Sequence, residues 1–289
     1  MTRQYKLLKV GSDAEFFLLK DKNPFPVCGL LGGTKENPRP VLEGNGYAVQ
    51  EDNVLVEFNI PPANTAIEFH ESISKMLSYL KEEMQKNNLE CRYNSSELFE
   101  QKILEQYPQA YQFGCEPDFC VWTKSVNPSP EFPEVWCNYP NKPKTKDDKI
   151  IYEPRTAGYH IHVSYLVDNQ PSSLADKELF VKAQDLFLGV SSVLLETSNS
   201  RRKYYGRAGA FRPKEYGHEY RVLGSALLSD SPAINQWIFN QNNRIINWLN
   251  TENAGPILEN NAETIVATIN ASDREMARQL VSIFKIDMP

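Results

Sequence analysis

Two acidic residues near the start of the chain, Asp13 and Glu15, lie two positions apart in a segment that alternates like a β-strand. Side chains two apart on a strand stand side by side on one face of the sheet. Two carboxylates placed in this way repel each other, and a divalent cation between them relieves the repulsion because hard cations prefer oxygen ligands. A D-x-E pair is also common by chance, so this pair alone is weak evidence for a metal site.

Two later predicted strands repeat this arrangement. Residues 53–60 carry Glu57 and Asn59 opposite an apolar face, and a Pro-Pro pair ends the strand. His160 and His162 also share one strand face, and imidazole both binds metals and donates hydrogen bonds to phosphate. Both strands also have an ordinary interpretation, in which the polar face of an edge or half-buried strand is turned to water.

The stretch 201–221 is locally basic in an acidic chain, with five arginines, two lysines and four tyrosines. Arginine suits planar, bidentate recognition of carboxylate and phosphate. Alternation along the strand that ends this stretch places Glu219 and Arg221 on one face. The stretch therefore predicts a site for an anion and a metal. The alternative is a solvated basic loop followed by a strand with a salt-bridged pair.

The apolar periodicity predicts helices that surround these strands. In the first of them Thr65 serves as N-cap and Glu68, three residues later, completes a capping box. This helix should pack on the back of the sheet through an apolar stripe made of Ile67, Ile73, Met76, Leu77 and Leu80. The predicted helices cover residues 64–90, 97–107 and 172–200 and most of the chain after 230.

The remaining segments are predicted to be a loop, a strand and an exposed excursion. Residues 21–47 are rich in Gly, Pro and Asn and form a loop or open hairpin, in which 29–35 matches neither glycine-rich phosphate motif. Residues 113–122 form a strand that carries Asp118, and residues 124–149 form the excursion.

Composition restricts the class of protein. The 289 residues are 41% hydrophobic and 24% charged, as in an ordinary globular chain, and the net charge of −6 argues against a general nucleic-acid binder. The five cysteines are odd in number and lack a C-x-x-C motif, which favours reduced thiols. The N-terminus lacks the apolar run of a signal peptide and no stretch is long enough to span a membrane, so we expect a cytoplasmic protein.

The polar strand faces come from separate strands, and their convergence in one curved antiparallel sheet would form an acidic-histidine metal cup with an arginine rim. This ordering resembles the carboxylate-amine ligases of the glutamine synthetase and glutamate-cysteine ligase superfamily, and most closely the phage-type COOH-NH2 ligase (amidoligase) family. The resemblance rests on five segments between residues 11 and 221: G-S-D-A-E, V-E-F-N-I-P-P, G-C-E-P-D-F, R-T-A-G-Y-H-I-H-V-S and R-R-x-Y-Y-G-R-A-G-A-F-R-P-K-x-Y-G-H-E-Y-R.

The resemblance implies an α+β fold and a set of site residues. The fold would be a single glutamine synthetase-like ligase domain over residues 1–289, with a curved, mainly antiparallel sheet, helices on its outer face and a helical part from about 230. The implied metal ligands are Asp13, Glu15, Glu57, His160 and Glu219. The implied cofactor-binding residues are His162, Arg201, Arg202 and Asn59. The implied catalytic arginines are Arg207, Arg212 and Arg221.

The activity implied by the resemblance is ATP-dependent amide formation with Mg²⁺ or Mn²⁺, through an acyl phosphate that an amine attacks. Substrates would be small-molecule or peptide carboxylates and amines, and Asp118 and Asn59 are candidate substrate contacts. Two departures leave the metal count open: Asp13 stands where glutamine synthetase usually has Glu, and the metal acids do not match one to one. The alternatives are an inactive member of the fold that acts as a binding or virion-associated protein, and a metal-dependent phosphohydrolase.

Overall fold

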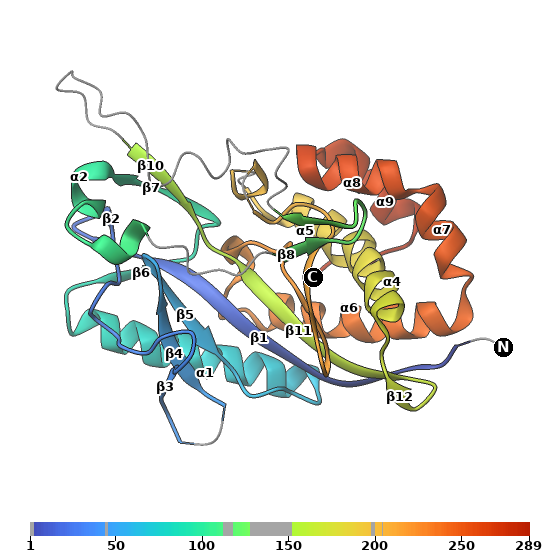
Figure 1. Ribbon diagram of the computed structural model, residues 1–289, viewed down its shortest axis with the longest axis horizontal. Helices are drawn as coiled ribbons and strands as arrows, with labels where there is room; N and C mark the ends of the chain where they lie inside the picture. Colours follow the sequence, from blue (N-terminus) through green and yellow to red (C-terminus); the bar gives the residue numbers. More distant parts are fainter. Residues whose placement is uncertain (1–2, 44–45, 112–117, 128–151, 198–199, 204) are drawn as a thin grey trace.

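A computed structural model describes residues 3–43, 46–111, 118–127, 152–197, 200–203 and 205–289 (Figure 1). Within these residues a twelve-stranded sheet dominates the fold, and all of its paired strands are antiparallel. Its main path runs β3-β4-β5-β1-β11-β14-β13-β8-β9, while β2 and β6 pair with β1 and β12 pairs with β11. The long strand β1 therefore lies at the centre of the sheet.

The strands of this sheet are β1 (Tyr5–Lys20), β2 (Asn23–Phe25), β3 (Arg39–Pro40), β4 (Ala48–Asp52), β5 (Leu55–Asn59), β6 (Glu90–Arg92), β8 (Asp118–Cys120), β9 (Ser125–Asn127), β11 (Tyr159–Val167), β12 (Gln170–Pro171), β13 (Ala210–Lys214) and β14 (Gly217–Tyr220). A separate two-stranded sheet joins β7 (Ser96–Glu100) to β10 (Tyr152–Thr156).

The strand register gives the sheet one apolar and one polar face at its centre. Phe58 pairs with Ala14, which pairs with Tyr159, and these side chains are buried in the main core. One position along, Asp13 pairs with both Asn59 and His160. Because directly paired residues of antiparallel strands point to the same side, the polar residues form rows across one face.

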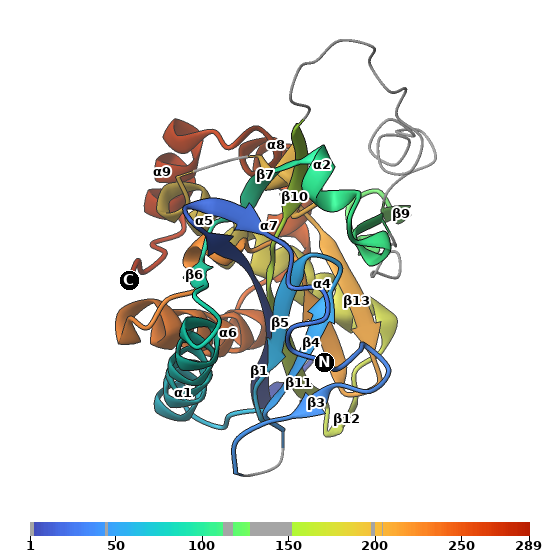
Figure 2. The same ribbon diagram turned by 90° about the vertical axis from the view of Figure 1, so that its left-hand side faces the viewer.

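Helices cover the apolar face, as predicted. They are α1 (Ala66–Gln85), α4 (Leu174–Gln184), α5 (Val190–Leu195), α6 (Pro232–Thr251), α7 (Ala254–Asn260), α8 (Ala262–Ala271) and α9 (Arg274–Ile283). The short α2 (Gln101–Leu104) instead buries Leu104 in a separate cluster with Phe17 and Leu55. Figure 2 shows α1 and α6 side by side, and both contribute to the core that includes β1. The predicted α+β class, with its antiparallel sheet and helical C-terminal part, is therefore confirmed.

Helix α1 begins where the sequence predicts and ends earlier. The Thr65 side chain caps it by accepting from the backbone N–H of Glu68 at 3.1 Å, whereas the Glu68 carboxylate accepts from the backbone N–H of Asn64. Ile67 is 60% exposed, so its place in the predicted apolar stripe is wrong. The helix ends at Gln85 and the chain enters β6 instead of remaining helical to residue 90.

Four further predictions need correction. Asn53 and Val54 form the turn between β4 and β5 and do not belong to the strand. The predicted helix 97–107 begins as β7 and contains only the single helical turn α2. The predicted helix 172–200 is interrupted by a π-helical turn, η2, over Asp185–Gly189.

The last of the four is the basic stretch 201–221, which forms the antiparallel hairpin β13–β14 and not a loop with one strand. Three short 3-10 turns complete the elements: η1 (Pro108–Tyr111), η3 (Arg201–Lys203) and η4 (Ser225–Leu227). The predicted strand 113–122 and excursion 124–149 lie largely outside the described residues, and their described parts are β8 and β9.

Two negative findings hold over the described part of the chain. No helix there is both long and apolar enough to cross a membrane. Of the cysteines described there, Cys28, Cys91 and Cys120 form no disulfide.

Candidate active site

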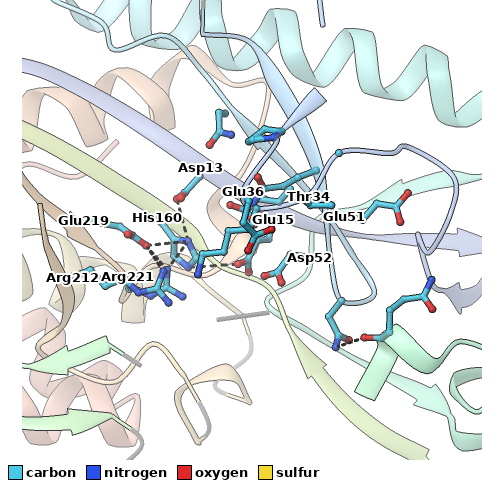
Figure 3. A pocket seen from close by; sticks show the side chains of 18 of the residues that line it. Asp13, Glu15, Thr34, Glu36, Glu51, Asp52, His160, Arg212, Glu219 and Arg221 are labelled. Carbon is cyan, nitrogen blue, oxygen red and sulfur yellow. Dashed lines mark hydrogen bonds and ion pairs between the residues drawn. The ribbon is translucent and has the colours of Figure 1, made fainter. Parts of the chain in front are cut away.

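A cavity of about 640 Å³ opens on the polar face of the sheet (Figure 3). Strands β1, β4, β5, β11, β13 and β14 form its floor, and the segment 33–38 forms one wall. The sequence-predicted residues that line it are Asp13, Glu15, Glu57, Asn59, His160, Arg212, Glu219 and Arg221. The described structure thus brings together eight residues that are spread over more than 200 positions of the chain.

One candidate metal group consists of Asp13, His162 and Glu219, whose ligand atoms all lie within 4.8 Å of one another. Asp13 Oδ1 lies 3.1 Å from His162 Nε2 and 3.2 Å from His160 Nδ1, but neither contact has hydrogen-bond geometry. A buried carboxylate oxygen without a hydrogen bond fits a cation ligand. Burial would raise the pKa of Asp13, but the adjacent His162 and His160 together outweigh burial and hold that pKa well below its ordinary value.

A second candidate group consists of Glu15, Asp52 and Glu57, also with ligand atoms within 4.8 Å. Burial, followed by the charge of Asp52, raises the pKa of Glu15 to about 7. Burial and the neighbouring charges of Asp13, Asp52 and Glu15 raise the pKa of Glu57 well above its ordinary value. Two buried carboxylates and the half-buried Asp52 are mutually repulsive, and an oxygen-only set suits Mg²⁺ or Mn²⁺. The residues present therefore fit a divalent cation.

Asp52 is a candidate ligand that the sequence interpretation missed. It ends β4, next to the Asn53 turn, and lies two residues after Gln50, which pairs with Glu57. The signal was the Gln50-x-Asp52 alternation beside a glycine- and proline-rich segment. It was missed because residues 48–52 were not predicted as a strand.

His160 lies at the centre of the site and is 2% exposed. Its Nδ1 is 3.3 Å from Arg221 Nη1 and its Nε2 is 3.9 Å from Glu15 Oε1. Burial and the charge of Arg221 lower the pKa of His160 to about 4, so the ring is neutral near pH 7. The predicted metal ligand was His160, yet the histidine in the first candidate group is His162, the predicted nucleotide contact.

Glu219 is surrounded by three cationic side chains. Arg212 Nη1 lies 3.3 Å and Lys214 Nζ 3.2 Å from its carboxylate, and Arg221 Nη1 donates to Oε1. Burial would raise the pKa of Glu219, but the charge of Arg221 beside it lowers that pKa to about 2. Lys214, which the sequence interpretation did not single out, thus joins the predicted arginines at the cavity.

The three remaining predicted arginines do not line this cavity in the described structure. Arg201 donates to the backbone carbonyls of Arg221 and Val222, both at 3.1 Å, and so supports the chain behind the site. Arg202 donates to Ser192 and Ser272 and lies 3.4 Å from Glu196.

The nucleotide contact predicted for Arg202 finds no support in this arrangement, because its partners lie on or beside helices α5 and α8. Arg207 lies in the turn before β13. Of Asp118 the structure describes the backbone, at the start of β8, and no side-chain position.

A second, smaller cavity of about 320 Å³ adjoins the first through Asn59. Its walls are mainly apolar and include Ile60, Pro62 and the ring of Tyr216. His162 lines it as well and pairs through Nδ1 with the Tyr216 hydroxyl. Two residues predicted to bind cofactor, His162 and Asn59, therefore lie where the two cavities meet.

The glycine-dense segment 29–35 does not present free backbone donors to the cavity. The backbone N–H groups of Gly29, Leu31 and Gly32 donate to the Glu51 carboxylate at 2.7 to 2.8 Å. This arrangement is an anion-binding nest filled by a side chain of the same protein. It agrees with the absence of a phosphate-binding motif and fixes the wall that carries Thr34 and Lys35 into the cavity.

Comparison with known proteins gives one family. Residues 150–282 match the family described as "Phage phiEco32-like COOH.NH2 ligase-type 2", which confirms the family resemblance over this segment. The segment contains His160, His162, Glu219 and Arg221 but none of the predicted residues on β1 and β5.

Comparison with curated proteins gives no match. Among solved structures, one titled "GmaS/ADP complex-Conformation 1" aligns over 100% of this chain and 71% of its own, with 11% identity and a TM-score of 0.37. At that score the alignment carries no argument about this chain.

Proposed function

From a chain whose residues 150–282 match a COOH.NH2 ligase family, we infer an ATP- and Mg²⁺-dependent ligase that joins a carboxylate to an amine. The observation that supports this most is the juxtaposition of two candidate metal groups and three cations in one cavity. Phosphoryl transfer needs positioning and charge neutralisation rather than elaborate covalent chemistry from the protein. The cavity contains the groups for both.

Two divalent ions, Mg²⁺ or Mn²⁺, would be held by the two candidate groups. Asp13, His162 and Glu219 would hold one, and the group of Glu15, Asp52 and Glu57 would hold the other. When bound, such ions would offset the charge that develops on the transferring phosphoryl group. His160, neutral and central, would orient the two groups relative to each other.

The remaining roles follow from charge and from the shape of the walls. The apolar cavity between Ile60 and Tyr216 would bind the adenine ring of ATP, with Asn59 and His162 at its junction with the phosphates. Arg212, Lys214 and Arg221 would then bind the phosphates or the substrate carboxylate, because they surround Glu219 of the first candidate group.

In the reaction, an oxygen of the substrate carboxylate attacks the γ-phosphorus of ATP, and the bond to the leaving ADP oxygen breaks. The resulting acyl phosphate is attacked by the amine nitrogen, the C–N bond forms, and inorganic phosphate leaves with the C–O electron pair. The amine loses a proton in this second step. We propose small-molecule or peptide substrates in the cytoplasm, without a nucleic-acid or membrane partner.

The first test is isothermal titration of the protein with ATP, in the presence of Mg²⁺ or Mn²⁺ and in their absence. We expect binding that requires the metal and is at least tenfold weaker in Glu15→Gln. The Gln side chain can still accept the 2.6 Å hydrogen bond from Gly158 N–H, so the change removes charge rather than structure. Glu259→Gln, an exposed acid that pairs with Lys182 outside the cavity, is the matched control and should bind as wild type does.

Equal affinity with and without metal, or in Glu15→Gln and wild type, would contradict the metal assignment. ADP release that proceeds without any added amine would favour the phosphohydrolase. Absence of ATP binding under every condition would favour an inactive member of the fold.

A further inference from the structure

Two consecutive buried residues, Gln184 and Asp185, form hydrogen bonds with strand β14 on the face opposite the cavity. Gln184 Oε1 accepts from His218 Nε2 at 2.6 Å, and Asp185 Oδ1 accepts from the Tyr220 hydroxyl at 2.8 Å. All four side chains have a relative exposure of 0%. They lie on the side of the sheet opposite the cavity and line no described cavity wall. We call these four residues the β14 clamp.

Two residues of the clamp, His218 and Tyr220, flank the candidate metal ligand Glu219 in the sequence. His218 and Tyr220 lie two positions apart on β14, so they share the back face, and Glu219 between them faces the cavity. Arg221 follows Tyr220 and also faces the cavity. A shift of β14 by one residue would exchange its two faces and move Glu219 into the core. Two polar pairs on the back face therefore select the register that presents Glu219.

The helical segment that carries Gln184 and Asp185 changes from α-helix to π-helix between these two residues. Gln184 is the last residue of α4 and Asp185 the first of the π-helical turn η2. Neighbouring residues of a regular α-helix are about 100° apart and do not readily face the same strand. A π-helical turn changes this spacing, and such turns often occur at functional sites. Here it places both side chains against β14.

Further hydrogen bonds anchor the clamp to the rest of the molecule. The Asp185 carboxylate also accepts from Trp122 Nε1 at 2.6 Å and from the backbone N–H of Gly209, in the turn before β13. Gln184 Nε2 donates to Asn242 Oδ1 on α6 at 2.9 Å. The clamp thus connects β14 to α6, to the β8–β9 connection and to the start of β13, which carries Arg212.

We propose that Gln184 and Asp185 are positioning residues that set β14 so that Glu219 and Arg221 face the metal and phosphate groups; this rests on the proposed function. An apolar back face of the same shape would oppose a one-residue shift, which buries Glu219, but not a two-residue shift, which keeps the same faces. The two buried pairs supply that discrimination because an alternative register would break the bonds of His218 to Gln184 and of Tyr220 to Asp185.

The test measures Mn²⁺ affinity by electron paramagnetic resonance in wild type, Tyr220→Phe, Asp185→Leu and the double variant. We expect each single variant to bind Mn²⁺ at least threefold more weakly. The double variant should be no weaker than the worse single one, since both changes remove the same bond. Leu258→Ala, which truncates a fully buried side chain of α7 away from β14, is the stability-matched control and should keep wild-type Mn²⁺ affinity.

Hydrogen exchange of the same variants provides a readout that needs no ligand. The clamp variants should exchange the amides of 217–221 at least tenfold faster, whereas Leu258→Ala should leave them unchanged. Folded clamp variants with wild-type Mn²⁺ affinity would overturn the proposal. If wild type binds no Mn²⁺, the proposed function fails, and the clamp is then judged by exchange: unchanged protection of 217–221 would overturn it separately.

Discussion

Glu57 is a side chain that is costly to ionise in the ligand-free protein. It lies with Glu15 and Asp52 in a buried group whose ligand atoms are within 4.8 Å, and Gln50 is its hydrogen-bonding neighbour on β4. Two unit charges at such a separation interact by about 3 kcal/mol at an effective dielectric constant of about 20. The three carboxyl groups therefore lower the stability of the ligand-free fold, and a bound cation would offset their repulsion.

Glu57→Gln should consequently have opposite effects on stability and on binding. In metal-free buffer with a chelator, we expect the free energy of unfolding to rise by up to about 3 kcal/mol, because the folded protein no longer has to protonate Glu57 or hold a repelled charge there. Mg²⁺-dependent ATP binding should fall at least tenfold. Denaturant unfolding and calorimetric titration measure the two quantities. A variant that is less stable and binds ATP normally would show that Glu57 has a purely structural role.

Glu219 would be a poor choice for the same experiment. Its carboxylate balances Arg212, Lys214 and Arg221, so Glu219→Gln would leave buried cations without their counter-charge. Breaking a buried pair in this way typically costs about 3 to 5 kcal/mol. Loss of binding in that variant would therefore not separate metal ligation from folding.

At the scale of single elements, the wall formed by residues 29–38 depends on the tight approach of Gly33 to β4. Gly33 has φ +85°, and a Cβ there would lie 2.4 Å from the carbonyl oxygen of Val49 and 2.7 Å from Arg39 N. Both neighbours are backbone atoms of paired strands and cannot move aside without breaking β3–β4 pairing. Gly29 has a similar φ of +78°, with nothing within 4 Å of an added Cβ.

These two glycines form a matched pair for mutagenesis. Gly29→Ala should cost about 1 to 2 kcal/mol of unfolding free energy, the penalty for a left-handed conformation alone. Gly33→Ala should cost clearly more, since a steric clash adds to that penalty, and should also weaken ATP binding by displacing the wall. Urea unfolding of both variants gives the comparison. An equal loss of unfolding free energy in the two variants would mean that the wall accommodates a Cβ at Gly33 without a steric penalty.

The elements also show what can be predicted from this sequence. Alternation identified β1, β5 and β11, and because side chains on a strand follow a strict period of two, it also identified the face that carries Asp13, Glu57 and His160. It could not identify β4, which is short and lies beside a segment rich in turn residues. Nor could it show the hairpin β13–β14, where Pro213 and several charges obscure the strand pattern.

Pairing between distant segments was the part least accessible to the sequence. The choice between His160 and His162 as the ligand beside Asp13 depends on the register of β1 against β11 and on side-chain rotamers, neither of which alternation specifies. The hydrogen bonds of Arg202 to Ser192 and Ser272 depend on how α5 and α8 pack, which the local sequence does not show. Local sequence supplied the functional groups, and tertiary packing decided which of them reach the cavity.

At the scale of the whole molecule, the candidate site joins the two halves of the chain. The segment that matches the ligase family begins at residue 150, yet Asp13, Glu15, Asp52 and Glu57 all precede it. Antiparallel pairing of β1 with β11 brings the halves together at the centre of the sheet. Among the described residues, the group of Glu15, Asp52 and Glu57 lies wholly in the first half, whereas the group around Asp13 needs His162 and Glu219 from the second.

The free energy of unfolding of the whole protein should depend on pH through the ionisation of Asp185. Burial raises the pKa of this carboxyl to about 7, although hydrogen bonds from Trp122, Tyr220 and Gly209 partly oppose the shift. An acid whose pKa is higher in the folded than in the unfolded state binds more protons when folded. Its contribution to stability is therefore complete below its ordinary pKa of 3.8 and is lost as the pH rises towards 7.

Comparison with Asp185→Asn isolates this contribution, because the other titrating groups are common to both proteins. We expect the wild-type unfolding free energy to fall relative to the variant between about pH 4 and 7, with a slope of at most about 1.4 kcal/mol per pH unit. Above pH 7 the difference should be constant. Denaturant unfolding at several pH values measures it. A difference that stays level from pH 4 to 7 would show that the three donors keep Asp185 ionised, and one that rises with pH would show that they lower its pKa below 3.8 despite its burial.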